Sequence, residues 1–307
     1  MSSNADDSVQ KETLLVAGLE VYAYYSKAKS NPFDTKSIGD DESLKVMFSL
    51  HGRNGSAQES DGLYRDLVTR YYKESPSQSL VIITFDHRNH GKRAVNKDRN
   101  KTWKEGNDSH GADMLSIITG GVADVKTIYD YLPALVPGLS KYKRVTHVMS
   151  GISMGAMTTL RVAVQHPGIF SGAVSLIGSF DLTSSLMNRL HDFGRSALYK
   201  ESYDSFSKSF EPRLYPRELF DVVAKDDTYC ANNYDLDDKL KTFLMFGDHD
   251  NIIPSSRSEP FLTKHGKKFK SRQDFDSKEQ FQAIKYNAEH EVTTEMREDW
   301  TTWLVKF

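Results

Sequence analysis

A serine between two glycines marks an abrupt change from a predicted strand to a predicted helix. The pentapeptide Gly-Ile-Ser-Met-Gly at 151–155 follows the apolar run 145–149 and precedes the apolar, proline-free stretch 156–165. A strand that turns this sharply into a helix leaves almost no room for side chains beside the central residue, which accounts for both glycines. The segment therefore predicts a nucleophile elbow, a turn that lifts the Ser153 hydroxyl above the edge of a sheet.

Predicted strands and predicted helices alternate through most of the chain. The strands are apolar on both faces, which is typical of a mainly parallel central sheet with helices on both sides. We therefore predict an α/β fold, in which Pro133 and Pro137 end the helix that precedes the pentapeptide. The predicted strands are at 14–25 (with a turn at Gly18), 44–50, 80–85, 145–149, 173–177, 240–246 and 281–286, and the predicted helices at 63–71, 122–132, 156–165 and 296–307.

Two segments are predicted to lie outside this alternation. Residues 1–12 are polar and of mixed charge, without the apolar core of a signal peptide, so we expect a disordered tail. The remainder, 13–307, has the length of a single domain. Inside it, from about 183 to 237, apolar residues recur at helical spacing without strands, which predicts a helical cap over the sheet. The alternative is that these helices only add packing.

The composition excludes several kinds of partner. The formal net charge is −2 with no block of one sign, which argues against nucleic acid or an anionic membrane surface. The lysines between 264 and 270 have acidic neighbours and are interpreted as a solvated face. No apolar run reaches the length of a membrane span. The single cysteine, Cys230, excludes an intrachain disulfide and fits a reducing compartment, so we expect a cytoplasmic protein. No feature predicts an oligomeric state.

Polar loops follow several of the predicted strands. Functional residues of a parallel sheet collect beyond the carboxyl ends of its strands. Together these loops offer a nucleophile, an acid and a base in the chain order Ser, Asp, His, which is what acyl transfer requires. The loops are 51–55 (His-Gly-Arg-Asn-Gly), 86–91 (Asp-His-Arg-Asn-His-Gly), Ser153, Asp181, 247–250 (Gly-Asp-His-Asp) and His290.

These residues resemble the α/β-hydrolase fold superfamily, and the resemblance covers nearly the whole chain from about Leu14 to Phe307. The matching positions are His51-Gly52, the Asp-x-Arg-x-His-Gly stretch at 86–91, the pentapeptide 151–155, Gly247-x-x-Asp250 with Pro254, and His290 before the last helix. The form of the 86–91 stretch, together with Asn-Asp-Ser-His at 107–110, is similar to esterase-like members from fungi and bacteria.

The resemblance implies a role for each matching residue. Ser153 is the expected nucleophile, His290 the base that takes its proton, and Asp250 the acid that orients the imidazole. The backbone N–H groups of Met154 and Arg53 are the expected oxyanion donors.

Some assignments stay open at this point. Asp248 lies two residues before Asp250, and Asp181 follows the previous strand, where members of this fold also keep the acid. Arg53 and Asn54 stand where many members have small or aromatic residues. The Arg53 guanidinium therefore either binds an acidic substrate group or points to solvent.

Several histidines have simpler explanations than chemistry. Asp86, His87 and His90 look like metal ligands, but a convincing fourth ligand is missing, so we predict a structural loop and no metal. His51 is expected to fix its loop by hydrogen bonding. His110, with Trp103 before it, either lines the pocket or only packs.

The function predicted from these residues is a serine hydrolase that cleaves a carboxylic ester or thioester of modest size through an acyl-enzyme. Its expected partner is a small acyl substrate, and no cofactor is required. The alternatives are a non-catalytic binding or receptor module on the same fold, a prolyl-oligopeptidase-like peptidase, and transfer of the acyl group to an acceptor other than water.

Overall fold

The computed structural model describes residues 9–29, 31–36, 38–39, 42–191, 203–206, 211–234, 236 and 239–307. Within these residues nine strands form one sheet, in the order β1-β2-β4-β3-β5-β6-β7-β9-β8. The first two strands are antiparallel to their neighbours, and every other pairing is parallel. The strands are β1 (Val9–Val16), β2 (Leu19–Ser26), β3 (Ser43–Leu50), β4 (Ser79–Phe85), β5 (Arg144–Ile152), β6 (Gly172–Leu176), β7 (Lys241–Gly247), β8 (Lys270–Ser271) and β9 (Phe281–Tyr286).

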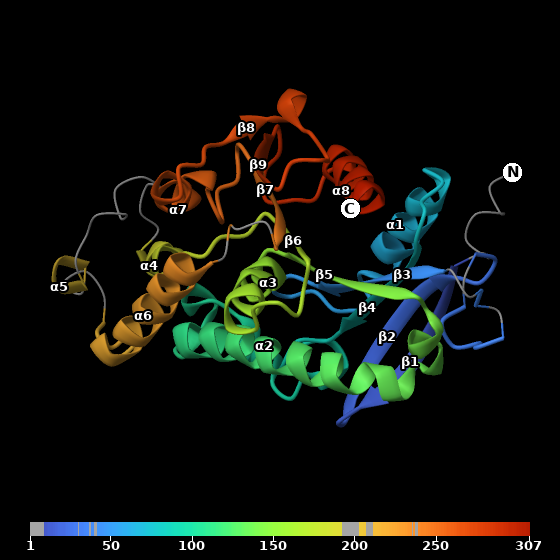
Figure 1. Ribbon diagram of the computed structural model, residues 1–307. Helices are drawn as coiled ribbons and strands as arrows, with labels where there is room; N and C mark the ends of the chain where they lie inside the picture. Colours follow the sequence, from blue (N-terminus) through green and yellow to red (C-terminus); the bar gives the residue numbers. More distant parts are fainter. Residues whose placement is uncertain are drawn as a thin grey trace, which may run out of the picture.

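Helices cover both faces of the sheet (Figure 1). On β3, Met47 packs into an apolar cluster with α1 and α8, whereas Val46 and Phe48 pack into a second cluster with α2. Because successive side chains of a strand point to opposite faces, a strand buried on both sides must be apolar throughout. The predicted α/β architecture is confirmed. The helices are α1 (Asp61–Lys73), α2 (His110–Leu135), α3 (Met154–Gln165), α4 (Leu182–His191), α5 (Tyr203–Phe206), α6 (Arg217–Asn233), α7 (Glu259–Lys264) and α8 (Thr294–Lys306).

Several predicted boundaries are wrong, and the helix predicted from residue 122 begins at His110. Strand β1 begins at Val9, so residues 9–12 are not part of a disordered tail, and 1–8 lie outside the described residues. The start of β1 is polar because β1 is an edge strand, and its Lys11 forms an ion pair with Asp61 of α1. Helix α2 continues past Pro133 to Leu135. A proline in the last turn removes only one helical hydrogen bond, which the packed helix tolerates.

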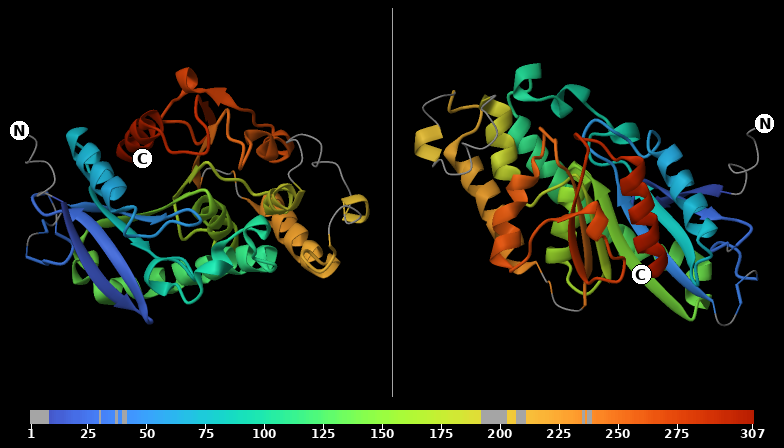
Figure 2. Two further views of the ribbon diagram at one scale, coloured as in Figure 1. Left: turned by 180° about the vertical axis from the view of Figure 1, so that it is seen from behind. Right: turned by 90° about the horizontal axis from the view of Figure 1, so that it is seen from above.

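The predicted cap region contains α4, α5 and α6, while 192–202, 207–210, 235, 237 and 238 lie outside the described residues. These three helices lie at the end of the molecule opposite the β1–β2 hairpin (Figure 2). Helix α6 packs against α3, where the fully buried Arg161 forms ion pairs with Asp226 and Asp227. Helix α6 is therefore part of the helical layer beside the sheet, and a cap remains a prediction for the other two.

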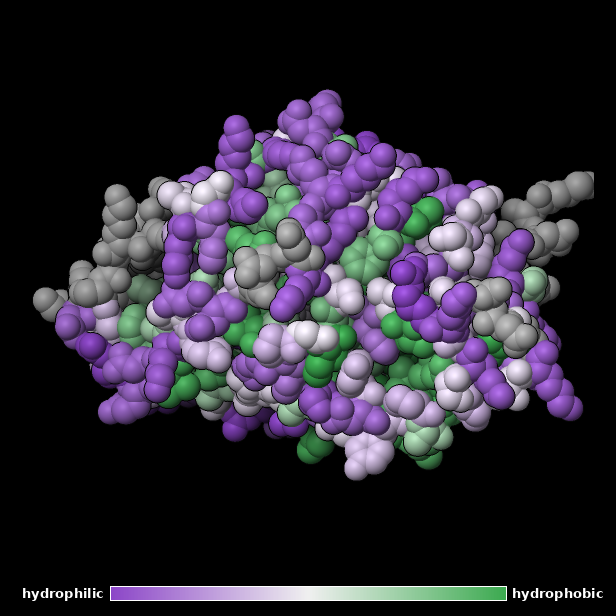
Figure 3. Space-filling view, viewed as in Figure 1, coloured by the Kyte–Doolittle hydropathy of each residue, from purple (hydrophilic) through white to green (hydrophobic). Residues whose placement is uncertain are grey.

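The face shown in Figure 3 is mainly hydrophilic, with apolar residues in small separate groups. Among the described helices, none combines the length and the apolar character needed to cross a membrane.

Candidate active site

Ser153 lies in a strained turn between β5 and α3. Its backbone has φ 54° and ψ −111°, a region that residues with a side chain rarely adopt. Both flanking glycines are sterically required. A Cβ on Gly151 would lie 2.2 Å from the carbonyl oxygen of Gly155, and a Cβ on Gly155 would lie 2.4 Å from that of Leu50. The pentapeptide thus forms the sharp strand-to-helix turn that the sequence predicted.

The three predicted triad side chains are hydrogen-bonded in series. Ser153 Oγ lies 2.9 Å from His290 Nε2, and His290 Nδ1 lies 2.7 Å from Asp250 Oδ2. They follow β5, β9 and β7, parallel strands whose carboxyl ends meet at one edge of the sheet. An ionised carboxylate only accepts hydrogen bonds, so Nδ1 carries the imidazole proton. Nε2 is then free to accept the serine proton.

The turn after β7 holds the Asp250 carboxylate in place. The side chain is buried, and its second oxygen, Oδ1, accepts the N–H groups of Ile252 and Ile253, each at 2.8 Å. With Oδ1 occupied by two backbone donors, Oδ2 is left facing His290. The orientation of the imidazole is therefore set by backbone geometry.

The other two candidate acids are engaged elsewhere. Asp181 Oδ1 accepts the N–H of Ser184 at 2.8 Å, at the start of α4. Asp248 Oδ1 lies 3.2 Å from Lys285 Nζ. Of the three aspartates that the sequence left open, the structure places only Asp250 in contact with His290.

Both predicted oxyanion donors lie next to Ser153 in the chain or in space. Met154 is the first residue of α3, so its N–H has no carbonyl partner within the helix and lies at the positive end of the helix dipole. Gly52 lies against the serine, since a Cβ on Gly52 would be 3.4 Å from Ser153 Cβ. The Gly52 carbonyl accepts from Gly55 N–H at 3.1 Å and from His51 Nδ1 at 2.8 Å. In the trans peptide between Gly52 and Arg53, the Arg53 N–H points away from the Gly52 carbonyl oxygen. The bonds that fix the carbonyl therefore also fix the direction of the Arg53 N–H.

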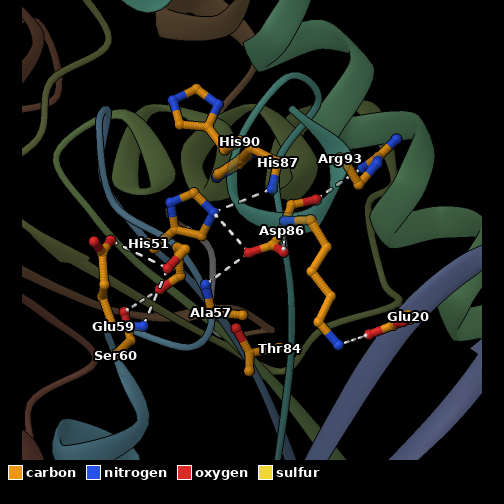
Figure 4. A network of polar contacts seen from close by, with 12 residues as sticks. Glu20, His51, Ala57, Glu59, Ser60, Thr84, Asp86, His87, His90 and Arg93 are labelled. Carbon is orange, nitrogen blue, oxygen red and sulfur yellow. Dashed lines mark hydrogen bonds and ion pairs between the residues drawn. The ribbon is translucent and has the colours of Figure 1, made fainter. Parts of the chain in front are cut away.

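His51 links this loop to the loop after β4 (Figure 4). It is buried, and its Nε2 accepts the N–H of His87 at 3.1 Å, which leaves the ring proton on Nδ1. Burial lowers the pKa of His51 to about 4, so the ring stays neutral at ordinary pH. Asp86 accepts the backbone N–H groups of Ala57 and Lys92, each at 2.8 Å. These contacts give both loops a structural role, and the described residues hold no group of three or more His, Cys, Asp or Glu placed to bind a metal.

We expect replacement of His51 with alanine to lower kcat about 100-fold, because the Gly52–Arg53 peptide loses the bond that orients it. His51→Asn places an amide N–H near the position of Nδ1 and should recover much of the rate. Steady-state kinetics well below the melting temperature separate this effect from lost stability. Equal loss in both variants, or a rise in KM with unchanged kcat, would contradict a role for His51 in orienting the oxyanion donor.

The Arg53 side chain does not extend to solvent. It is partly buried, and Nη1 donates to the carbonyl oxygen of Asn100 at 2.8 Å.

His110, buried at the start of α2, packs edge-on against Trp103 with 4.9 Å between the ring centroids. Trp103 belongs to the same apolar cluster as Met154. Sequence reasoning missed Arg189, whose Nη1 lies 3.2 Å from His110 Nε2, and Arg257, which donates to the carbonyl oxygen of Ile252. Nothing in the chain pattern indicates that their segments meet here.

The chain matches no protein-family model and no curated protein sequence. Solved structures resemble it over almost its full length. An esterase of Pyrococcus furiosus has 16% identity over 97% of this chain and 90% of its own, with a TM-score of 0.52. A Butyrivibrio proteoclasticus protein with bound ferulic acid has 16% identity over 96% of each chain and a TM-score of 0.51. An acylaminoacyl peptidase of Pyrococcus horikoshii has 15% identity over 96% of this chain and 40% of its own, with a TM-score of 0.55. At these identities the likeness is one of fold.

Proposed function

We propose that this chain, which has the α/β-hydrolase fold, is a serine hydrolase that cleaves a carboxylic ester or thioester of modest size. The observation that carries the proposal is the hydrogen-bonded series from Ser153 through His290 to Asp250. A strained serine with φ 54° supports it further, because such strain persists where the surrounding structure enforces it and is concentrated at functional sites.

The geometry supports a two-step reaction. His290 Nε2 takes the Ser153 proton as Oγ attacks the carbonyl carbon, and Asp250 stabilises the imidazolium that forms. The N–H groups of Met154 and Arg53 stabilise the negative charge that develops on the carbonyl oxygen. His290 then gives its proton to the leaving alcohol or thiol, which leaves the acyl group on Ser153. Attack by water, activated by the same histidine, releases the acid and restores the enzyme.

A binding module on the same fold is the alternative from a different class. Binding alone needs neither a histidine in contact with the serine nor a buried carboxylate behind that histidine, and the chain has both. The likeness to an esterase and to a peptidase is compatible with hydrolysis of either bond type. Within the described residues, the face in Figure 3 shows no broad apolar patch of the kind that would bind a lipid surface, which favours a small substrate.

A fluorophosphonate probe tests the proposal directly, because it reacts with an activated serine. We expect time-dependent, stoichiometric labelling that peptide mass spectrometry locates at Ser153, with none in Ser153→Ala or in heat-denatured protein. A small dialkyl fluorophosphate used in parallel excludes poor access as a reason for failure. If neither reagent labels well-folded protein, the serine is not activated and the hydrolase proposal is wrong.

A further inference from the structure

Three arginines from separate segments gather beside the candidate triad. Arg53 belongs to the oxyanion loop, Arg189 to α4, and Arg257 to the turn Ser255–Ser258 after β7. Arg53 and Arg257 both lie close enough to Arg189 for their charges to act on it. Burial, together with the positive charges of Arg53 and Arg257, lowers the pKa of Arg189 to about 9. Bringing three guanidinium groups together in a partly desolvated place costs free energy unless an anion offsets their charge.

The cluster adjoins the catalytic groups through several contacts. Arg257 donates to the carbonyl oxygen of Ile252 at 3.1 Å, and the N–H of Ile252 binds the Asp250 carboxylate. Leu186 and Met187 of α4, which precede Arg189 on the same helix, share an apolar cluster with Met154, the residue after the nucleophile. The positive charge therefore comes from three segments that adjoin the candidate site: the oxyanion loop, α4 and the turn that holds the triad acid.

The hydrogen bonds that Arg53 and Arg189 form within the described residues are with neutral atoms. Arg53 donates to the Asn100 carbonyl, and Arg189 Nη1 lies 3.2 Å from His110 Nε2. His110 does not compensate them, because burial and the charges of Arg189 and Arg53 lower its pKa to about 3 and keep it neutral.

Glu105 acts on Arg53 from nearby. Glu105 raises the pKa of Arg53 against the effect of burial, but its carboxylate already accepts the N–H and the hydroxyl of Thr102 at 2.8 and 2.7 Å. Among the residues the structure describes, Arg53 and Arg189 form no ion pair with a carboxylate.

Elsewhere in the same molecule a buried arginine is neutralised. Arg161 lies 2.6 Å from Asp226 and 2.5 Å from Asp227, two carboxylates for one guanidinium. The difference between this structural arginine and the pair Arg53 and Arg189 points to a missing anion. A guanidinium presents a planar fork of N–H donors that suits the oxygens of a carboxylate or a phosphate.

We propose that the substrate carries an anionic oxygen group, a carboxylate or a phosphate, which Arg189 binds together with Arg53 and Arg257. The proposal rests on the hydrolase function proposed above and specifies its substrate class. The anionic group lies at a distance from the bond that is cleaved, so it supplies binding and orientation while Ser153 attacks the uncharged ester carbonyl.

The test compares two esters that differ in one charge. The first is the mono-4-nitrophenyl ester of adipic acid, which carries a free carboxylate, and the second is the same compound with that carboxylate converted to a methyl ester. We expect kcat/KM to be at least about 10-fold higher for the charged ester at low ionic strength, and this preference to shrink as salt is added. Arg189→Gln should lower kcat/KM for the charged ester about 10- to 100-fold, the loss expected for one charge-assisted interaction. The same variant should lower kcat/KM for the neutral ester far less, so that the ratio of kcat/KM between the two esters falls.

Arg217→Gln is the matched control, since it removes an exposed arginine paired with Asp204 and Asp221 and changes the net charge equally. Equal kcat/KM for the two esters at every salt concentration would overturn the proposal, as would an equal loss for both in Arg189→Gln. Competitive inhibition by adipate compared with phenyl phosphate tells which anion the site prefers.

A binding measurement tests the anion site separately from the proposed hydrolase function. Adipate or phenyl phosphate should raise the Tm of the wild-type protein and of Arg217→Gln, but not that of Arg189→Gln. If this pattern holds while neither ester is hydrolysed, the anion site stands and the hydrolase function fails. If hydrolysis is seen without a charge preference and without the Tm shift, the hydrolase function stands and the anion site fails.

Discussion

Replacing Ser153 with alanine is expected to reduce kcat for ester hydrolysis by about 10⁶-fold, because the nucleophile, base and acid of a triad act as a unit. The residual rate comes from binding and from the oxyanion donors alone. The fold should survive. Alanine meets the same backbone strain at φ 54° as serine does, and the lost hydroxyl contacts His290, which is itself partly exposed. We therefore expect a nearly unchanged Tm.

The measurement is the turnover of a 4-nitrophenyl ester, with the variant purified separately from any wild-type protein because traces would dominate a rate this low. Ser175→Ala provides a matched control. Ser175 is a buried serine on the neighbouring strand β6, and its hydroxyl oxygen has no hydrogen-bond partner among the described residues. Ser175→Ala should keep full activity. Wild-type turnover in Ser153→Ala would place the nucleophile elsewhere.

The sequence predicted those parts of the site that depend on strand order alone. A parallel sheet brings the carboxyl ends of neighbouring strands together, so residues that follow β5, β7 and β9 had to meet at one edge. The elbow was predictable for a steric reason, since only glycine fits at 151 and 155. The edge strand β1 began earlier than predicted because its exposed side is polar, which made its first residues resemble a tail.

What the sequence left open depends on turn geometry and packing. Three aspartates follow strand ends, and the sequence favoured Asp250 only through its resemblance to the family pattern. The choice of Asp250 comes from the turn in which Ile252 and Ile253 present their N–H groups to one carboxylate oxygen. The arginine cluster was unpredictable in the same sense, because Arg189 reaches the site only through the way in which α4 packs beside Met154.

Replacing Asp250 with asparagine is expected to lower kcat about 10⁴-fold, and the structure indicates how. The N–H groups of Ile252 and Ile253 require an acceptor at the Oδ1 position, so the amide oxygen should stay there. The amide NH₂ then faces His290 Nδ1, which must become an acceptor and lose its proton to Nε2. An imidazole protonated at Nε2 cannot take the Ser153 proton. Because both backbone hydrogen bonds survive, the stability of the fold should change little.

Asp181→Asn and Asp248→Asn are the matched controls, since each makes the same chemical change at an aspartate that does not contact His290. Asp181→Asn keeps an oxygen that can accept the Ser184 N–H, and Asp248→Asn loses only a partly exposed ion pair with Lys285. Both should retain kcat within about threefold of wild type, the range expected for surface substitutions. A mild effect of Asp250→Asn together with a severe effect of Asp181→Asn would place the acid after β6. In that case the bond between Asp250 and His290 would be structural, and the tautomer argument above would not hold.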